Sequence, residues 1–568
     1  MTKKFYLVIL VCIILSMSII STNLYAKKQP NIGDVLKETE PDDKIEKKKK
    51  ENEIPTIEEK PIKEPMKNLD GKKVLVKKIK VEGNHVISSD KLEKLVNTDE
   101  FVKKKLSLAE MEEAATVITK YYREQGYFVA RAYIPKQEMK NDILTIAVIE
   151  GQYGKFKLTN DSFIKDSIVQ AMLDSIKDEN IISVNTIERA MLIINDTPGA
   201  RVTQADVMPG EELGTSDFAI TTKATKRFSG YVVADNYGGE YTGENRLSGA
   251  FNINSPFKLG DKLSVQSMLT DKSGIENYRL SYSLPLSASG LRGEVAYSDT
   301  EYELSEEYED LDAVGSSENL ELNFTYPVKR TRLSNIEAFV NLSKRDMVDE
   351  IRLIADKTEK EAESINTGIS FTNNKRVYNW NSQTKVTFDF TVGDLDFEDA
   401  ADKAEDEAGA DTNGQYSKVN LSLQEKLRFN SKWSLDSSLE CQYALNNKNL
   451  DGSEDLSIGG SNGVKLYPTS EHSAENGYLL NLELFYNLPD YKKVSSKVSL
   501  FYDLGRAYMA DNTVGFEPRT LQDIGLGYYI NYKDVFVNIH WAHKIDDEDV
   551  TSEDDYDDKL LFQTGFVF

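Results

Sequence analysis

Two periodicities of apolar residues divide the chain. From about residue 73 to 226, helical spacing and strand-like alternation occur in turn. In one unit, a helix is expected to end at Gly126. Apolar and polar residues then alternate over Phe128–Ile134, which indicates a strand that ends at Pro135, and a second strand is expected over Ile143–Glu150. Glycine permits the left-handed turn that stops a helix, and proline lacks the N–H that a strand interior needs. The pattern predicts a helix packed on a hairpin.

The same spacing predicts two small α+β domains, at 73–151 and 152–226. In the first, Val74–Val81 suits one opening strand and Lys91–Val96 a helix. The second repeats the plan. Phe156 and Leu158 open it, two amphipathic stretches follow at 164–176 and 184–195, and a strand is expected over Val202–Val207.

After about residue 226, segments of roughly ten residues alternate apolar and polar side chains between turn-rich or acidic stretches. Examples are Tyr278–Leu286, Leu480–Leu488 and Val535–Trp541. This is typical of an outer-membrane barrel, although a large soluble β-sandwich or propeller would alternate similarly. About 340 residues, at about twenty per strand and loop, predict around sixteen antiparallel transmembrane strands over 227–568.

The N-terminal 72 residues have a different composition. Met1–Ala26 reads as a secretory signal, with Lys3 and Lys4 before an apolar run, and the run is short for the alternative, a transmembrane anchor. Residues 27–72 form a Lys-, Glu- and Pro-rich linker, which cannot bury enough apolar surface to order itself. Its one candidate helix is Ile32–Lys37.

Composition and spacing narrow the function classes. A formal net charge of −25 argues against a nucleic-acid partner, and Cys12 and Cys441 would leave one thiol after signal cleavage. We find no nucleophile–base cluster, phosphate-binding loop or metal-ligand spacing, so we expect neither an enzyme nor a cofactor. The acidic stretches 301–312, 394–411 and 546–558 are expected on solvated loops.

The hairpin unit resembles the first polypeptide-transport-associated (POTRA) domain of two-partner-secretion transporters, outer-membrane pores that export large adhesins and haemolysins. The matching residues are Tyr122, Arg123, Gly126, Tyr127, Ala130, Arg131, Ala132, Tyr133, Pro135, Gln137, Glu150 and Gly151. The second unit resembles its counterpart at Glu188, Arg189, Leu192, Asn195, Pro198, Gly199, Pro209, Gly210, Gly214 and Asp217. The barrel start matches at Asp235, Asn236, Gly243, Arg246, Asn254, Pro256, Phe257, Gly260 and Asp261.

The resemblance extends to the end of the chain. Leu560, Phe562, Phe566 and Phe568 share one strand face. The terminal pair, Phe566 and Phe568, resembles the C-terminal signal by which barrels are recognised for insertion. In the family, a helix in the region of Ile32–Lys37 can plug the pore.

A glycine-rich loop supplies the candidate site. Ser457–Pro468 occupies the place of a loop that folds into the lumen in the resembled superfamily, where the tip reads Val-Arg-Gly-aromatic. Here the tip is Val464, Lys465, Leu466 and Tyr467, and Lys lacks the planar fork of Arg. In the family the tip docks on an acidic strand residue. Alternation turns Asp503 toward the lumen, so the resemblance implies a Lys465–Asp503 contact. Glu483 is the competing partner, and a solvated Lys465 is the third reading.

The resemblance implies a transporter in the outer membrane of a Gram-negative bacterium, with its POTRA domains in the periplasm. Those domains would capture an extended segment of one secreted exoprotein, and the barrel would conduct it as the in-folded loop moves aside, driven by folding outside. Other expected partners are outer-membrane lipid and the barrel assembly machinery, with the chain a monomer. Two alternatives stay open: a factor that assembles other barrels, and a passive channel.

Overall fold

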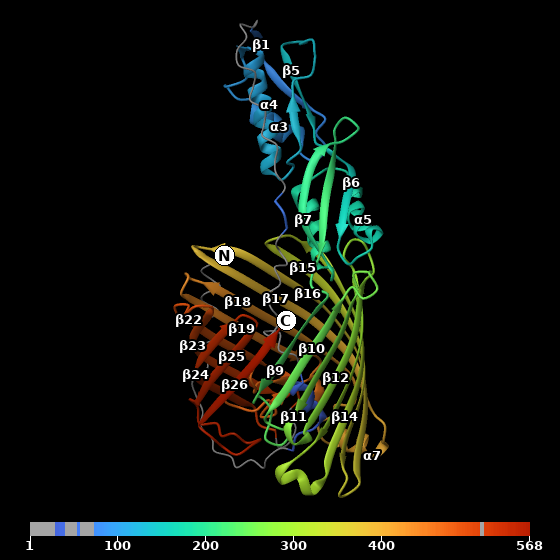
Figure 1. Cartoon of the computed structure of the whole chain (residues 1–568), viewed down its shortest axis with the longest axis vertical. Helices are drawn as coiled ribbons and strands as arrows, with labels where there is room; N and C mark the ends of the chain where they lie inside the picture. The colour runs from blue at the N-terminus through green and yellow to red at the C-terminus, as the bar shows by residue number, and fades with distance from the viewer. Residues whose placement is uncertain (1–28, 40–53, 57–72, 512–515) are drawn as a thin grey trace.

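The computed structural model describes residues 29–39, 54–56, 73–511 and 516–568. The signal expected at Met1–Ala26 and most of the linker lie outside the described residues. Figure 1 shows two small domains stacked end to end on one mouth of a barrel. Because the domains precede the barrel, the mouth that carries them is the one we expect to face the periplasm.

The first small domain packs two helices on a three-stranded sheet of order β2-β5-β4. Its elements are β1 (Val74–Val76), β2 (Lys78–Glu82), α3 (Ser89–Val96), β3 (Lys104–Leu106), α4 (Leu108–Glu124), β4 (Arg131–Tyr133) and β5 (Ile143–Ile149). Strand β2 runs parallel to β5, whereas β4 runs antiparallel to it.

Two expected strands of this domain differ from the structure. The single opening strand is two strands, since β1 pairs with β3 and β2 pairs with β5. The chain changes sheets at Lys77, whose N–H bonds to the carbonyl of Asp142. The strand expected over Phe128–Ile134 is shorter in the structure and consists of β4 alone. The N–H of Ala130 donates to the carbonyl of Tyr127, so the residues before β4 form a turn.

Helix α4 shows why the local sequence folds as it does. Ser107 caps its start, and Ser107 and Glu110 form a reciprocal capping box. Its buried face includes Met111 and Ile118. The helix ends before Gly126, whose φ of 91° is the left-handed conformation that glycine adopts without strain.

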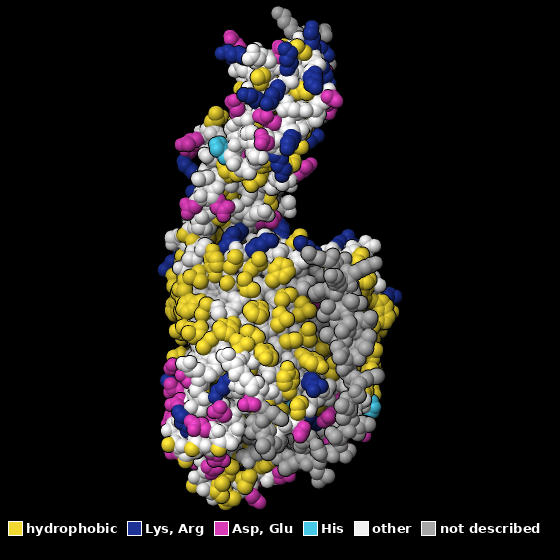
Figure 2. Space-filling model, turned by 180° about the vertical axis from the view of Figure 1, so that it is seen from behind, with side chains coloured by type: hydrophobic (Ala, Val, Ile, Leu, Met, Phe, Trp, Pro, Cys, Tyr) yellow, Lys and Arg dark blue, Asp and Glu magenta, His cyan; other side chains and the backbone are white. Residues whose placement is uncertain are grey.

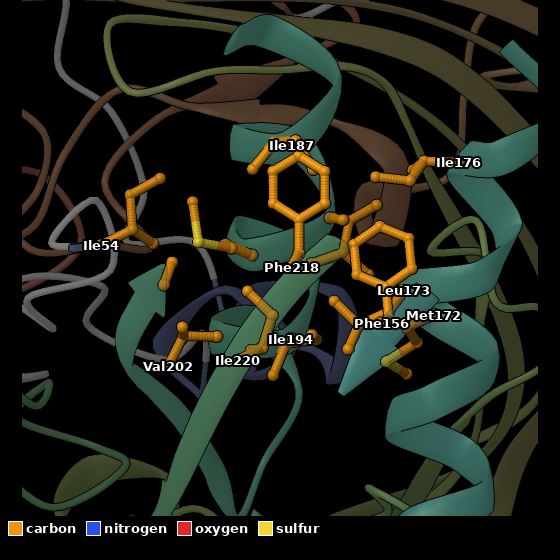
Figure 3. Close-up of a cluster of buried hydrophobic side chains, with 14 of the residues drawn as sticks. Ile54, Phe156, Met172, Leu173, Ile176, Ile187, Ile194, Val202, Phe218 and Ile220 are labelled. Carbon is orange, nitrogen blue, oxygen red and sulfur yellow. The ribbon is translucent and has the colours of Figure 1, made fainter. Parts of the chain in front are cut away.

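The second small domain repeats the α+β plan with the sheet order β6-β8-β7. Its elements are β6 (Gln152–Asp161), α5 (Asp166–Asp174), η1 (Ser175–Glu179), α6 (Val184–Asp196), β7 (Ala200–Pro209) and β8 (Thr215–Ala224). The rings of Phe156 and Phe218 stack with centroids 5.4 Å apart at the centre of its core. Figure 3 shows this core between the helices and the sheet.

Sixteen of the strands that follow close into one antiparallel barrel, as the sequence predicts. They are β9 (Phe228–Asp235), β10 (Arg246–Asn254), β11 (Lys262–Thr270), β12 (Ile275–Pro285), β13 (Arg292–Glu303), β14 (Ala313–Arg330), β15 (Ser334–Ile351), β16 (Asp356–Val377), β17 (Trp380–Phe397), β18 (Gly414–Arg428), β19 (Trp433–Ala444), β22 (Asn476–Asn487), β23 (Val494–Tyr508), β24 (Arg519–Tyr532), β25 (Val535–Lys544) and β26 (Asp558–Val567). The first and last strands, β9 and β26, pair to close it.

The outer surface of the barrel is apolar around its middle. Figure 2 shows a band of hydrophobic side chains below the small domains, and acidic side chains gather toward the opposite end. In β26, Leu560, Phe562 and Phe566 are exposed on one face, as alternation requires of a lipid-facing strand. Strands β14–β17 have 18 to 22 residues, whereas a membrane crossing takes about 9–11. These strands therefore extend beyond the membrane.

The end of the chain takes part in closing the barrel. Phe568 and Gly230 on β9 exchange both main-chain hydrogen bonds. The side chain of Asn236 then extends the seam by bonding to the N–H of Phe562 and the carbonyl of Leu560. No helix within the described ranges is long and apolar enough to cross a membrane.

Candidate functional site in the barrel lumen

The loop between β19 and β22 folds back into the barrel. It contains η4 (Gly452–Glu454) and the paired strands β20 (Leu456–Ser457) and β21 (Ser473–Ala474). Gly460, at φ 90°, donates its N–H to the carbonyl of Tyr467, which makes the tip compact. Val464 and Tyr467 at the tip have no exposed surface. The tip is thus a packed element rather than a solvated loop.

The structure brings Lys465 and Asp503 together. The Lys465 ammonium lies 2.7 Å from Oδ2 of Asp503, a fully buried carboxylate on β23. Oδ1 of Asp503 accepts a hydrogen bond from Asn481 Nδ2 at 2.8 Å, and the same amide donates to the carbonyl of Gly463. An ammonium bonds one carboxylate oxygen as a compact charge, so Asn481 supplies the second bond that a guanidinium fork could have made.

Glu483 is a neighbour of this pair rather than the partner of Lys465. Its carboxylate accepts hydrogen bonds from the hydroxyls of Ser499 and Tyr529. It lies on β22, on the same lumen-facing side as Asn481. Lys465 instead lies over the ring of Phe501, with its nitrogen 4.5 Å from the ring centroid.

Sequence reasoning missed three further contacts of the in-folded loop, two at its tip and one near its base. Asp523 on β24 accepts the N–H of Leu466 at 2.7 Å, and Asp546 accepts the Tyr467 hydroxyl at 2.8 Å. Arg519 forms a buried ion pair with Glu471 near the base of the loop. The expectation that stretch 546–558 is merely solvated is therefore wrong for Asp546. Cross-strand register could have suggested Asp523, because it lies directly opposite Asp503.

Helix α2 (Ile32–Glu38) occupies the lumen beside this loop. Asn31 caps it, and the Ile32 N–H donates to Asp349 Oδ1 on β15 at 2.8 Å. Ile32 and Val35 are fully buried in a cluster with barrel side chains from β11 to β19. A Cβ on Gly33 would lie 2.7 Å from backbone atoms of Gly452 and Ser453, so glycine permits this close approach.

The C-terminal end of α2 is held by polar contacts near the mouth opposite the small domains. Glu38 accepts hydrogen bonds from Thr242 Oγ1 at 3.0 and 3.1 Å, and its carbonyl accepts one from Arg246. Burial raises the pKa of Glu38 to about 7. Arg246 and Thr242 offset part of that rise, and Glu553 adds to it. Lys37 donates to the carbonyl of Ser453 at 3.2 Å.

A cavity of about 360 Å³ lies between α2 and the in-folded loop. Polar and apolar groups share its lining about equally, and the polar ones include Lys37, Glu38, Arg246, Lys418 and Gln442. A cavity of this size with polar groups in its wall has room for several ordered water molecules, so α2 and the loop do not fill the lumen completely.

In the first small domain, Glu150 connects three segments. Its buried carboxylate accepts the N–H groups of His85 and Val86 and the hydroxyl of Tyr122 at 2.7 to 2.9 Å. Burial, together with the Glu150 charge, raises the pKa of Tyr122 above its usual range. Tyr127 packs edge-on against Tyr122. The motif residues at this end of the domain thus fix its shape.

The other motif residues lie at turns and on the surface. Gly151 has φ 86° and a Cβ there would overlap Val129, so it needs to be glycine. Arg131 and Tyr133 are exposed on β4, and Pro135 follows that strand. They present a surface rather than a buried site.

The edges of the first sheet are partly bonded by side chains. On β2, Asn97 both accepts from the N–H of Ile79 and donates to its carbonyl. On β4, the N–H of Ala132 donates to Thr119 on α4. In the second domain, β7 is an edge strand that pairs only with β8 within the described ranges.

Ion pairs fasten the second domain to the barrel mouth. Arg330 pairs with Asp196 through two contacts of 2.7 Å, and Arg332 pairs with Glu188 at 2.6 Å. Arg189 donates to the carbonyl of Ser289 in the next turn. Glu188 and Arg189 belong to the matching residues of the second unit, and the structure adds that both contact barrel turns.

A sixteen-stranded barrel with a loop and a helix in its lumen, carried below two POTRA-type modules, defines an outer-membrane transporter of proteins. The model for haemolysin secretion/activation protein ShlB/FhaC/HecB matches residues 214–527. The model for the ShlB-type POTRA domain matches residues 74–151. The chain belongs to the ShlB/FhaC/HecB family of two-partner-secretion transporters.

Relatives and solved structures agree with this assignment. The heme/hemopexin transporter protein HuxB of Haemophilus influenzae (strain 86-028NP) is 25% identical over 455 residues, which cover 78% of each chain. The outer membrane transporter CdiB of Dickeya dadantii (strain 3937) is 22% identical over 374 residues, 65% of this chain and 64% of its own. The structure of CdiB from Escherichia coli superposes with a TM-score of 0.72 at 19% identity, covering 89% of this chain and 93% of that one.

Proposed function

We propose that this transporter exports one large polypeptide by exchanging helix α2 for the polypeptide in the lumen, while the loop tip stays docked. This proposal replaces the expectation that the in-folded loop moves aside. The observation that carries the proposal is that α2 and the in-folded loop share the barrel interior. Helix α2 packs against side chains of β11 to β19, and the loop tip contacts β22, β23 and β24, so together they reach most strands of the barrel wall. Passage of a polypeptide therefore requires one of the two to leave.

Helix α2 is the element with fewer anchors. It has seven residues and is held by the contacts of Ile32, Lys37 and Glu38 described above. The loop tip instead buries a complete ion pair, Lys465–Asp503, and is joined to the barrel at both ends. Removing one partner from a buried ion pair costs about 3–5 kcal/mol. Release of α2 is thus the easier rearrangement.

Recognition of the exported chain would use main-chain hydrogen bonds. An extended segment can add to an exposed strand edge, with side-chain pockets giving selectivity. Side chains already bond to the outer strands of the first sheet, through Asn97 and Thr119, and Asn195 accepts the N–H of Val202 near the start of β7. The rest of β7, over residues 204–209, is the edge that we propose for strand addition.

The remaining parts of the proposal concern energy and assembly. Folding of the exported chain outside the cell supplies the driving force, since we expect no nucleotide site. The chain works as a monomer in outer-membrane lipid, through the apolar band of Figure 2. The barrel assembly machinery recognises its last strand through Phe566 and Phe568.

The direct test compares culture supernatants and outer-membrane proteomes with and without the gene. We expect loss of one large secreted or surface protein, with other outer-membrane proteins unchanged. A broad fall in many outer-membrane proteins would contradict the proposal and indicate an assembly factor. An unchanged supernatant and surface would contradict it as well, and indicate a passive channel.

A further inference from the structure

A short piece of the linker is inserted into the second POTRA domain. Ile54 is 6% exposed and belongs to the hydrophobic core of that domain. Figure 3 shows Ile54 at one side of the cluster. Pro55 is half-buried and Thr56 is exposed. One apolar side chain of this segment is therefore bound in the core, and exposure increases over the two residues that follow it.

The backbone of this segment is held from the barrel side. Arg332 lies in the turn between β14 and β15 and donates to the carbonyl of Ile54 at 3.0 Å and to that of Pro55 at 3.1 Å. Its third contact, 2.6 Å to Glu188 on α6, fixes the guanidinium in place. A guanidinium that bonds two successive carbonyls recognises main chain, whatever the sequence.

An apolar pocket beside a main-chain clamp has the chemistry of a peptide-binding site. The site lies at the barrel mouth, where an exported chain must enter. Its present occupant is on the same linker as α2, since Ile54 follows the end of that helix by sixteen residues. Occupancy of this site and position of the plug are thus connected through one chain.

We propose that Ile54–Pro55 is an internal stand-in for the exported polypeptide, which inserts an apolar side chain into the same pocket and places its backbone against Arg332. This inference rests on the proposed function and adds the location of the binding site. A tethered ligand has an effective concentration of about millimolar, so a weak site is filled at rest. A partner that also adds to β7 displaces it and frees the linker that holds α2.

The first experiment uses the full chain in lipid nanodiscs and a fluorescent peptide of residues 51–60. Ile54→Asp should empty the pocket, and we expect this variant to bind the peptide at least tenfold more tightly than the unmodified chain. Thr56→Asp, a matched change at an exposed neighbour, should behave like the unmodified chain. Equal binding by all three chains would overturn the proposal.

A second variant tests the clamp. In the Ile54→Asp background, Arg332→Lys should weaken peptide binding about tenfold, because one ammonium cannot bond both carbonyls as the guanidinium does. Thermal unfolding of the barrel serves as the folding control. Unchanged binding in a folded Arg332→Lys chain would contradict the site.

A competition experiment separates this inference from the proposed function. The secreted protein identified by the gene comparison is added, as its purified N-terminal region, to the Ile54→Asp chain loaded with peptide. We expect displacement of the peptide. Binding without displacement would overturn the site while leaving export intact, whereas absence of any lost secreted protein would overturn export itself.

Discussion

The two elements in the lumen are held in different ways. The loop tip makes an ion pair, Lys465–Asp503, whose carboxylate is fully buried, and Asn481, Asp523 and Asp546 make further polar contacts with the tip. Helix α2 buries Ile32 and Val35 in an apolar cluster and bonds mainly at its two ends. A buried charge is costly to uncover singly, whereas a short amphipathic helix separates as a unit.

This difference indicates that α2, rather than the in-folded loop, serves as the gate of the pore. Apolar contacts and end bonds can be exchanged for those of another chain with similar chemistry. An ion pair with one fixed partner on β23 needs that partner. The lumen thus combines a permanent element with a replaceable one, and the predictions below test that division.

The largest effect is expected for Asp503→Ala. The change leaves Lys465 buried without its partner, so the loop tip should lose about 3–5 kcal/mol of docking free energy. Export should fall more than tenfold, and amide exchange at residues 457–468 should increase. The double variant Lys465→Met with Asp503→Leu should recover part of the export and part of the protection from amide exchange, because matched apolar replacement of a buried ion pair is often tolerated. Additive losses in the double variant would refute the coupling.

The next effect is expected for Gly33→Val. Its Cβ would overlap the backbone of Gly452 and Ser453, so α2 should leave the lumen while the loop stays. Conductance in planar bilayers should rise several-fold, with unchanged thermal stability of the barrel. Thr39→Val, at the C-cap of the same helix and outside this overlap, is the control. An unchanged conductance for Gly33→Val would show that α2 does not limit the pore.

A smaller effect is expected from pH. The pKa of docked Glu38 is raised to about 7 from an ordinary 4.5, so docked α2 binds the proton more tightly than released α2. Docking is then strongest below 4.5 and weakens as pH rises through 7. The charged groups facing Glu38 are Arg246, which opposes the shift, and Glu553, which adds to it.

The measurement is bilayer conductance between about pH 5 and 8, which should increase with pH. Glu38→Gln cannot titrate, so it should flatten the curve near its low-pH value. An equal pH dependence in the two chains would assign the response to another group. Thr39→Val, next to Glu38, is the matched control and should keep the response.

The smallest effect on the lumen is expected for Glu150→Gln. The amide cannot accept from all three donors, so the first small domain should lose about 1–3 kcal/mol of stability. Conductance should stay unchanged, since Glu150 contacts neither α2 nor the loop. Domain unfolding followed by circular dichroism, beside conductance, checks both statements. A conductance change would mean that the modules and the lumen are not separable.

Alternation explains how much of the barrel could be predicted from the sequence. A period of two assigns each strand residue to lipid or lumen, which places Asp503 inward and Leu560 outward from the sequence alone. The number of strands follows from the spacing of the alternating segments in the same way. The Lys465–Asp503 contact is predictable only through the family resemblance of the loop tip, because alternation alone leaves Glu483 as a competing partner.

Contacts between segments far apart in the chain cannot be predicted from the alternation of apolar and polar residues. Asp546 on Tyr467 and Arg332 on Ile54 join segments that are 79 and 278 residues apart, and no periodicity marks them. The split of the opening strand at Lys77 escapes prediction for a related reason, because alternation continues across a change of sheet. Tertiary pairing, rather than local preference, decides such positions.

The most direct test of the central claim locks each element in place, in a Cys441→Ser background. A short thiol cross-linker between Glu38→Cys and Thr242→Cys, whose side chains are in contact, should hold α2. Ile458→Cys with Gly505→Cys, where a Cβ on Gly505 meets Ile458, should hold the loop. Each is compared with its own unlinked form for export of the secreted protein. We predict that the α2 lock stops export and the loop lock does not. Continued export through the α2-locked barrel would contradict the account.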